Sequence, residues 1–329
     1  MIHDHAHTSG RSGRGLHALA GVLLLTTLFL LFAGGQVTST DSGDAVDSWP
    51  LPLRVALPEM TGGVFWELGH RQVAGFTGLL TGAFALCVLL RARRADAPAP
   101  WVRRLSYAAF GLVLAQAALG GVRVLVGTQY PGIASTPDEP FVIRAIAMVH
   151  ALVAQSFVAV VTTLWVATRP GFGRGARRAL PALEARAKFA LLALLLQIAL
   201  GAWLRHTMSG MGLVLHVAGA LLALIALARV SGAALNSDAN DAPGLRGPAL
   251  AIGFIVTVQF LLGVAALLLV EDGNARNAAF NFKAIIPSLH LVVAGLLVVC
   301  VQMLWVRSRH TLAAATAATP VPAAQGAFA

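Results

Sequence analysis

Eight long apolar segments, separated by polar stretches, dominate the hydropathy pattern of the chain. They occupy residues 16–34, 64–90, 105–127, 141–167, 187–205, 212–229, 249–270 and 285–305. A helix that crosses a bilayer needs about 20 mostly apolar residues, because the hydrocarbon core is ~30 Å thick and a helix rises ~1.5 Å per residue. The pattern therefore predicts an all-α integral membrane protein with eight transmembrane helices.

A cleavable signal peptide is the alternative interpretation of the first apolar segment. The segment lacks a clear small-residue cleavage site, and seven further segments follow it, so we expect a retained helix. The two cysteines, Cys87 and Cys300, both lie within apolar segments. They suggest neither a disulfide framework nor a thiolate metal site.

The composition agrees with a membrane location. Of 329 residues, 57% are hydrophobic and only 12% are charged, about half the ~25% charged residues of an average soluble protein. These values exclude a disordered chain, an ordinary soluble enzyme and a nucleic-acid-binding domain with a solvated basic surface. We therefore relate the net charge of +10 to orientation in the lipid bilayer and expect no nucleic acid partner.

The distribution of charge predicts that orientation. Both termini and every second connection hold 17 of the 24 Lys and Arg residues, whereas the alternate connections hold most of the Asp and Glu residues. Because basic residues collect on the cytoplasmic side of a membrane, both termini are expected to be cytoplasmic. We expect a multi-pass protein of the inner (cytoplasmic) cell membrane.

An internal repeat divides the chain into two halves. The odd-numbered segments carry a Gln-x-x-x-Gly pattern at residues 116–120, 197–201 and 259–263, and each even-numbered segment carries one histidine. We therefore expect two tandem four-helix bundles related by pseudo-twofold symmetry. The expected parts are a cytoplasmic tail (1–15), a first bundle (16–168), a cytoplasmic linker (169–188), a second bundle (189–306) and a cytoplasmic tail (307–329).

The histidines of the even-numbered segments are candidate functional residues, because an ionisable residue inside a bilayer marks a functional site by default. They are His70, His150, His216 and His290. Each lies roughly 5–10 residues from the outer end of its segment, so all four share one depth. A single such histidine could simply be a hydrogen-bonded contact between helices, and the N-terminal His3, His5 and His7 favour a disordered tail over weak metal binding.

Paired imidazoles in an apolar bundle fit heme better than zinc, which usually takes three or four protein ligands. Heme iron accepts axial nitrogen ligands from opposite faces, and helix bundles build such sites from facing helices. His70 with His150, and His216 with His290, would make two heme sites. Nearby glycines would leave room for the macrocycles: Gly69, Gly75, Gly78, Gly219 and Gly295.

The two halves differ at one carboxylate. Glu67 precedes His70 by three residues and lies on the same helix face, whereas Leu213 holds the equivalent place before His216. A carboxylate there can accept a proton or stabilise a developing cation, which suggests one reactive site and one cofactor site. The alternative is an interfacial glutamate that pairs with Arg71.

These residues resemble the heme A synthase family over residues 16–306. The first outer loop, GGQVTSTDSG at 34–43 running to WPL at 49–51, is similar to the opening motif of that family. MTGGVF at 60–65, followed by ELGHR at 67–71, is similar to its Glu-x-x-His-Arg signature. The eight-span, four-histidine plan in two copies also matches.

The resemblance implies oxidation of the C8 methyl of heme O to the formyl group of heme A, for cytochrome oxidase assembly. By carry-over, His70 and His150 would hold the substrate heme, with Glu67 as the catalytic carboxylate. His216 and His290 would hold a heme b cofactor. Heme O synthase and cytochrome oxidase assembly factors are the implied partners.

Two departures from the family pattern suggest a subtype: the first outer loop lacks a cysteine pair, and Leu68 stands where many members have another histidine. Heme propionates would need cationic partners at the outer end. The candidates, for which interfacial anchoring is the alternative role, are Arg71, Arg123, Arg144, Arg205 and Lys283.

Two other functions remain open. A non-enzymatic di-heme b cytochrome would use the same four histidines but would need no carboxylate beside one ligand. A transporter would suit the repeat, but it predicts helices broken near mid-membrane, whereas Pro287 lies only in the first turn of its segment.

Overall fold

The structure is a computed structural model that describes residues 4–46, 48–49, 60–94, 97–130, 139–172, 177–178, 180–238, 244–269, 282–309 and 311–312. Only the backbone is described for residues 4–12, 177–178, 238, 282 and 311–312. Several predictions concern residues outside this description. These are the His3, His5 and His7 side chains, part of the first outer-loop motif (Asp47, Pro50 and Leu51), and the acidic residues Glu59, Asp138, Glu271 and Asp272.

Eight helices form the described part of the chain, and each is long and apolar enough to cross a membrane. They are α1 (Asp4–Ser39), α2 (Gly62–Leu90), α3 (Pro100–Gly127), α4 (Phe141–Ala167), α5 (Pro181–Thr207), α6 (Gly210–Asp238), α7 (Arg246–Leu269) and α8 (Phe282–Arg309). The predicted all-α membrane fold is thus confirmed. One antiparallel pair of two-residue strands, β1 (Arg177–Arg178) and β2 (Thr311–Leu312), adds a small link.

The helices extend beyond the apolar segments that predict them. α5 begins at Pro181, so the last eight residues of the expected linker 169–188 are helical. Proline is favoured in the first turn of a helix, and the ion pair of Glu184 with Lys188 (2.8 Å) one turn further on supports helical structure there. α1 likewise begins at Asp4 and includes most of the expected tail 1–15.

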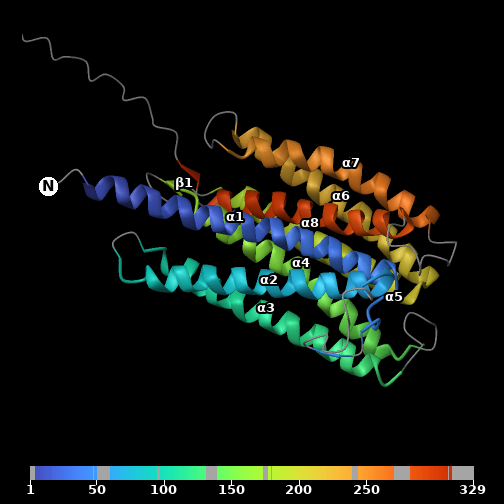
Figure 1. The fold of residues 1–329 in the computed structure, drawn as a ribbon. Helices are drawn as coiled ribbons and strands as arrows, with labels where there is room; N and C mark the ends of the chain where they lie inside the picture. The colour runs from blue at the N-terminus through green and yellow to red at the C-terminus, as the bar shows by residue number, and fades with distance from the viewer. Residues whose placement is uncertain are drawn as a thin grey trace, which may run out of the picture.

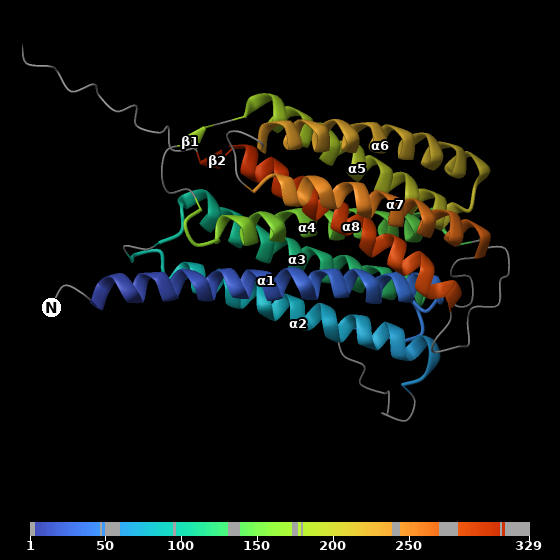
Figure 2. The same ribbon diagram turned by 90° about the horizontal axis from the view of Figure 1, so that it is seen from above.

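The helices pack in a pattern that repeats between the two halves (Figures 1 and 2). In each half, consecutive helices pack together and the first helix packs against the fourth. Between the halves, α1 packs against α8, α4 against α5, and α4 against α8. Exchanging each helix with the one four places later leaves this set of contacts unchanged, which is consistent with the predicted pseudo-twofold symmetry.

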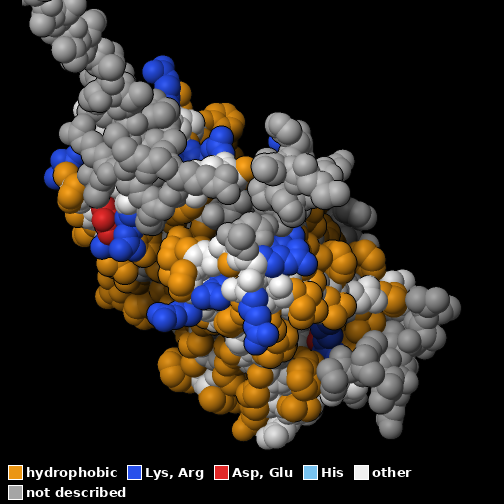
Figure 3. Space-filling model, turned by 90° about the vertical axis from the view of Figure 1, so that its left-hand side faces the viewer, with side chains coloured by type: hydrophobic (Ala, Val, Ile, Leu, Met, Phe, Trp, Pro, Cys, Tyr) orange, Lys and Arg blue, Asp and Glu red, His pale blue; other side chains and the backbone are white. Residues whose placement is uncertain are grey.

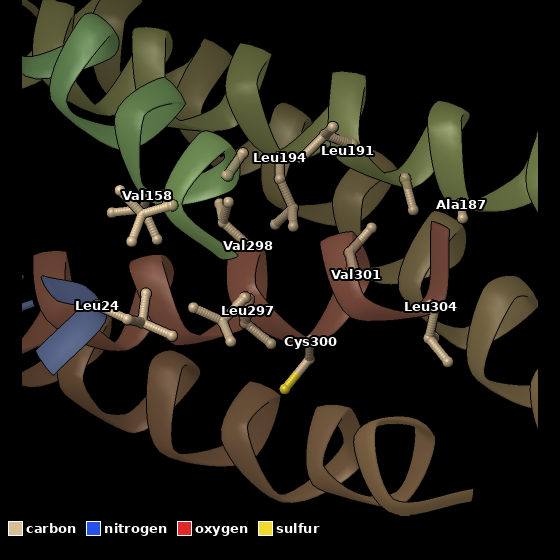
Figure 4. Close-up of a cluster of buried hydrophobic side chains, with 14 of the residues drawn as sticks. Leu24, Val158, Ala187, Leu191, Leu194, Leu297, Val298, Cys300, Val301 and Leu304 are labelled. Carbon is tan, nitrogen blue, oxygen red and sulfur yellow. The ribbon is translucent and has the colours of Figure 1, made fainter. Parts of the chain in front are cut away.

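The core lies where α4, α5 and α8 meet (Figure 4). Val158 of α4, Leu194 of α5 and Val298 of α8 are almost fully buried there. Polar contacts fasten α4 to α8 within this apolar region, because the Gln155 amide donates to the Leu291 carbonyl oxygen at 3.1 Å. Large apolar side chains on the outside, such as Leu79 (75% exposed), suit a surface that faces lipid.

The two ends of the bundle differ in chemistry. The start of α1 and the ends of α4 and α8 lie together, since His17, Trp165 and Arg307 line one cavity. Figure 3 views this end and shows Lys and Arg side chains gathered on it; we call it the basic end. At the opposite end, Arg123 of α3 pairs with Glu139 ahead of α4. We call it the histidine end, because the four predicted histidines lie near it.

Candidate functional site

The four predicted histidines lie at one depth near the histidine end. They follow the first residues of α2, α4, α6 and α8 by six to nine positions. At ~1.5 Å per residue this places them about 9–14 Å along their helices. All four are partly buried, and each packs against the helix that precedes its own in the sequence.

A glycine on that neighbouring helix receives each imidazole ring. The distance from the Cβ that each glycine would carry to Cε1 of the ring is 3.1 Å for Gly34 and His70, 3.8 Å for Gly120 and His150, 2.9 Å for Gly201 and His216, and 3.0 Å for Gly263 and His290. Three of these distances are too short for an ordinary contact. A larger residue there would displace the ring, so the glycines allow the imidazoles to lie against helix backbone.

The two histidines of the second half face each other. The ring centroids of His216 and His290 are 6.5 Å apart, with an angle of 65° between the ring planes. Two metal–imidazole bonds of about 2 Å, plus about one ångström from each bonded nitrogen to its ring centroid, span roughly 6 Å. The separation therefore fits axial ligation of one iron between the two rings.

The two histidines of the first half are also neighbours. His70 and His150 are close enough to interact electrostatically. The Nδ1 atoms of both rings are buried and have no hydrogen-bond partner among the described residues. Imidazoles with buried nitrogens that the described protein leaves unpaired, next to small residues, fit the chemistry of a heme ligand pair.

Glu67 is only 3% exposed, and both of its carboxylate oxygens are occupied. Oε2 accepts a hydrogen bond from the Val46 backbone N–H at 2.8 Å, and Oε1 accepts one from the Arg71 guanidinium. Arg71 also donates to the backbone carbonyl oxygens of Val46 and Ser48. The ion pair named as the alternative for Glu67 is therefore present, and it fastens the first outer loop to α2.

Three of the five propionate candidates come together at the histidine end. Arg123 pairs with Glu139 (3.3 Å), Arg144 donates to the Glu139 backbone oxygen (2.7 Å), and Arg205 donates to the Thr38 carbonyl oxygen (2.9 Å). Arg123 Nη1 and Arg144 Nε are buried without a partner in the described structure. Such unpaired cationic atoms can receive an anionic group.

The remaining two candidates lie apart from that group. Arg71 is committed to Glu67 and the first outer loop, and Lys283 lies in the first turn of α8. One member of the cationic cluster, His206, was not among the predicted site residues; it interacts electrostatically with Arg205, Arg123 and Arg144. Its position at the end of a segment, next to a basic residue, was the only available signal.

Within the described residues, no group of three or more His, Cys, Asp or Glu side chains is placed to hold a metal ion. Cys87 and Cys300 are both free thiols. All eight described helices are continuous, including α8 across Pro287, so they lack the mid-membrane breaks that a transporter predicts. The paired histidines are therefore the main candidate site.

The fold and the site define a multi-pass, eight-helix membrane protein with two pairs of intramembrane histidines. A comparison with sequence families matches residues 51–214 to the COX15-CtaA family, described as cytochrome oxidase assembly protein. The chain belongs to this family, which confirms the resemblance found in the sequence. The matched range includes Glu67, His70 and His150 and ends just before His216.

Two relatives carry the name heme A synthase. The protein of Symbiobacterium thermophilum is 30% identical over 199 residues, which cover 58% of this chain and 60% of that protein. The protein of an Exiguobacterium species is 32% identical over 114 residues, covering 32% of this chain and 35% of that protein. The match thus spans less than two thirds of the length of either relative.

Proposed function

We propose that this protein is a heme A synthase, which oxidises the C8 methyl group of heme O to a formyl group for cytochrome oxidase biogenesis. Membership in a cytochrome oxidase assembly family and similarity to two heme A synthases support this activity. The observation that carries the proposal is the pairing of four imidazoles at one depth, two in each half, with a carboxylate beside only one pair.

The two halves take different roles in this proposal. His70 and His150 hold the substrate heme O in the first half, near Glu67. His216 and His290 hold heme b in the second half. Heme b, when bound, supplies one-electron redox chemistry. The protein contributes imidazoles at fixed depth, a surrounding apolar bundle and a membrane setting from which an amphipathic substrate can enter.

Glu67 is the proposed catalytic carboxylate of the first half. Its negative charge lies three residues from His70, on the same face of α2, and can stabilise positive charge that develops on the substrate. Arg71 and the Val46 N–H hold the carboxylate in place, so its position depends on the first outer loop. Arg71 thereby acts on the site through Glu67.

The cationic cluster is the proposed propionate site. Arg123, Arg144, Arg205 and His206 lie close together at the histidine end, where Arg123 Nη1 and Arg144 Nε are buried donors without a partner in the described structure. Lys283 and Arg71 add positive charge at the same end. Propionates bound there would help to orient a macrocycle whose iron the paired imidazoles would hold. In the proposed orientation of the protein in the membrane, the histidine end lies outside, and the basic end, with both termini, lies in the cytoplasm.

A non-enzymatic di-heme b cytochrome is the second candidate. The observation that favours it is the full engagement of the Glu67 carboxylate by Arg71 and Val46, because a purely structural carboxylate would make the same contacts. The two functions differ in whether the heme bound in the first half is chemically converted.

The deciding experiment is expression of the protein together with a source of heme O, followed by acid-acetone extraction and chromatography of the hemes. Heme A and hydroxylated heme O are the expected products. Glu67→Gln should abolish both while heme b is retained, whereas Glu184→Gln, which alters an ion pair at the basic end, should leave the product unchanged. Unaltered product in Glu67→Gln would refute the catalytic role of Glu67.

A further inference from the structure

The Gln-x-x-x-Gly repeat pairs with the histidines in space. Where the glycine receives the ring, the glutamine one turn before it contacts the same histidine residue. Gln116 Nε2 donates to the backbone oxygen of His150 at 2.9 Å. Gln197 Nε2 donates to the backbone oxygen of His216 at 3.0 Å and lies 3.1 Å from its Nδ1.

The third glutamine, Gln259, also contacts the histidine of the following helix, His290, but through different atoms. Nδ1 of His290 donates to the backbone oxygen of Gln259 at 3.1 Å, and the Gln259 side-chain nitrogen lies 3.2 Å from His290 Nε2. A metal-binding histidine usually donates its other ring N–H to an acceptor of this kind, which fixes the ring orientation. Glutamine and glycine together therefore restrain a histidine from two points one helical turn apart.

The first helix lacks the glutamine. Gly34 receives the His70 ring on α1, but the residue four positions earlier is Leu30, which offers no side-chain amide. Nδ1 of His70 has no partner that meets hydrogen-bond geometry, although the His70 ring interacts with the Leu30 backbone. Among the four histidines, His70 is thus the one without a glutamine contact.

We propose that Gln116, Gln197 and Gln259 are positioning residues for the histidines of the following helix, and that Leu30 leaves His70 the most easily displaced imidazole of the four. The inference rests on the proposed ligation of heme by these histidines. Its consequence is an unequal pair in the first half, in which Gln116 holds the backbone of His150 and no glutamine holds His70. A small molecule that competes for the iron would enter on the His70 side.

The test measures carbon monoxide binding to the purified, dithionite-reduced protein, because carbon monoxide binds bis-histidine heme only where an imidazole leaves. Two kinetic phases are expected, and the faster one should disappear in His70→Ala/His150→Ala, which removes the first site. Leu30→Gln should slow the faster phase about tenfold, which corresponds to ~1.4 kcal/mol, the upper part of the range for one hydrogen bond.

Gln197→Met should accelerate the slower phase by a similar factor and shift the low-temperature electron paramagnetic resonance of the ferric heme, because Gln197 is the glutamine whose side chain lies against the Nδ1 of its histidine. Gln155→Met is the matched control, because it removes a buried amide that contacts the Leu291 backbone and no histidine. It should change neither phase nor spectrum.

The outcomes separate this inference from the proposed function. Variants that retain heme but show wild-type rates and spectra would overturn the positioning role. If the variants show these rate changes but the wild-type protein makes no heme A, only the enzyme assignment would be overturned. Protein that binds no heme, or whose heme spectrum ignores removal of all four histidines, would overturn both.

Discussion

The contact between Gly201 of α5 and the His216 ring gives a quantitative prediction. A Cβ at Gly201 would lie 2.9 Å from Cε1 of His216, whereas ordinary contacts begin near 3.4 Å, so the ring must move by about 0.5 Å. Because Gly201 lies within a helix, the substitution Gly201→Ala would otherwise gain ~0.5–1 kcal/mol. Overpacking of this kind costs roughly 1–3 kcal/mol. We therefore expect a net loss of stability, caused by displacement of the His216 imidazole.

Gly120→Ala is the control on α3 of the first half, where a glycine also faces a histidine ring but at a longer distance. Its Cβ would lie 3.8 Å from Cε1 of His150, an ordinary contact distance. We expect this variant to be neutral or slightly stabilised, and to retain its heme.

The assay compares both variants in detergent by thermal unfolding and by the amount of heme that remains after competition with apomyoglobin. Gly201→Ala should lose heme b about 5-fold to 150-fold more readily than wild type, as ~1–3 kcal/mol implies. Equal heme retention in Gly201→Ala and Gly120→Ala would refute the idea that these glycines are needed for the position of the imidazoles.

Two further predictions concern the first outer loop and the topology. Arg71→Met should destabilise the protein by ~3–5 kcal/mol in thermal unfolding, because it leaves the buried Glu67 carboxylate uncompensated, and adding Glu67→Gln should restore part of the loss; no recovery in the double variant would argue against the ion pair as the cause. The orientation can be tested in a variant with both native cysteines replaced by alanine. A single cysteine placed at Ala97 should react with an impermeant maleimide only after the membrane is opened, whereas one placed at Thr128 should react in intact cells. The reverse pattern would overturn the orientation.

The membrane fold was accessible from the sequence because its determinants are local. Length and apolarity fix each span, and the depth of His150 or His290 follows from counting residues along a helix. The pairing of helices across the two halves follows less directly, from the repeat. These features depend on periods and distances within single segments.

The surroundings of the site depend on contacts between distant segments. Occupation of the Glu67 carboxylate by Val46 requires the outer loop to fold back over α2. His206 joins the cationic cluster only because the ends of α3, α4 and α5 meet. The Gln-x-x-x-Gly pattern was visible in the sequence, but its relation to the histidines appears only when neighbouring helices are placed side by side.

The hydrogen bond from Arg205 to Thr38 joins the last turn of α1 to α5, across the boundary between the repeats. A cation at this position complements the negative C-terminal pole of the α1 dipole. Each repeat therefore no longer contains everything that its own helices need for termination. In a protein cut between α4 and α5, the fragment that ends with α4 would therefore lack the Arg205 partner of α1, although it holds four complete helices.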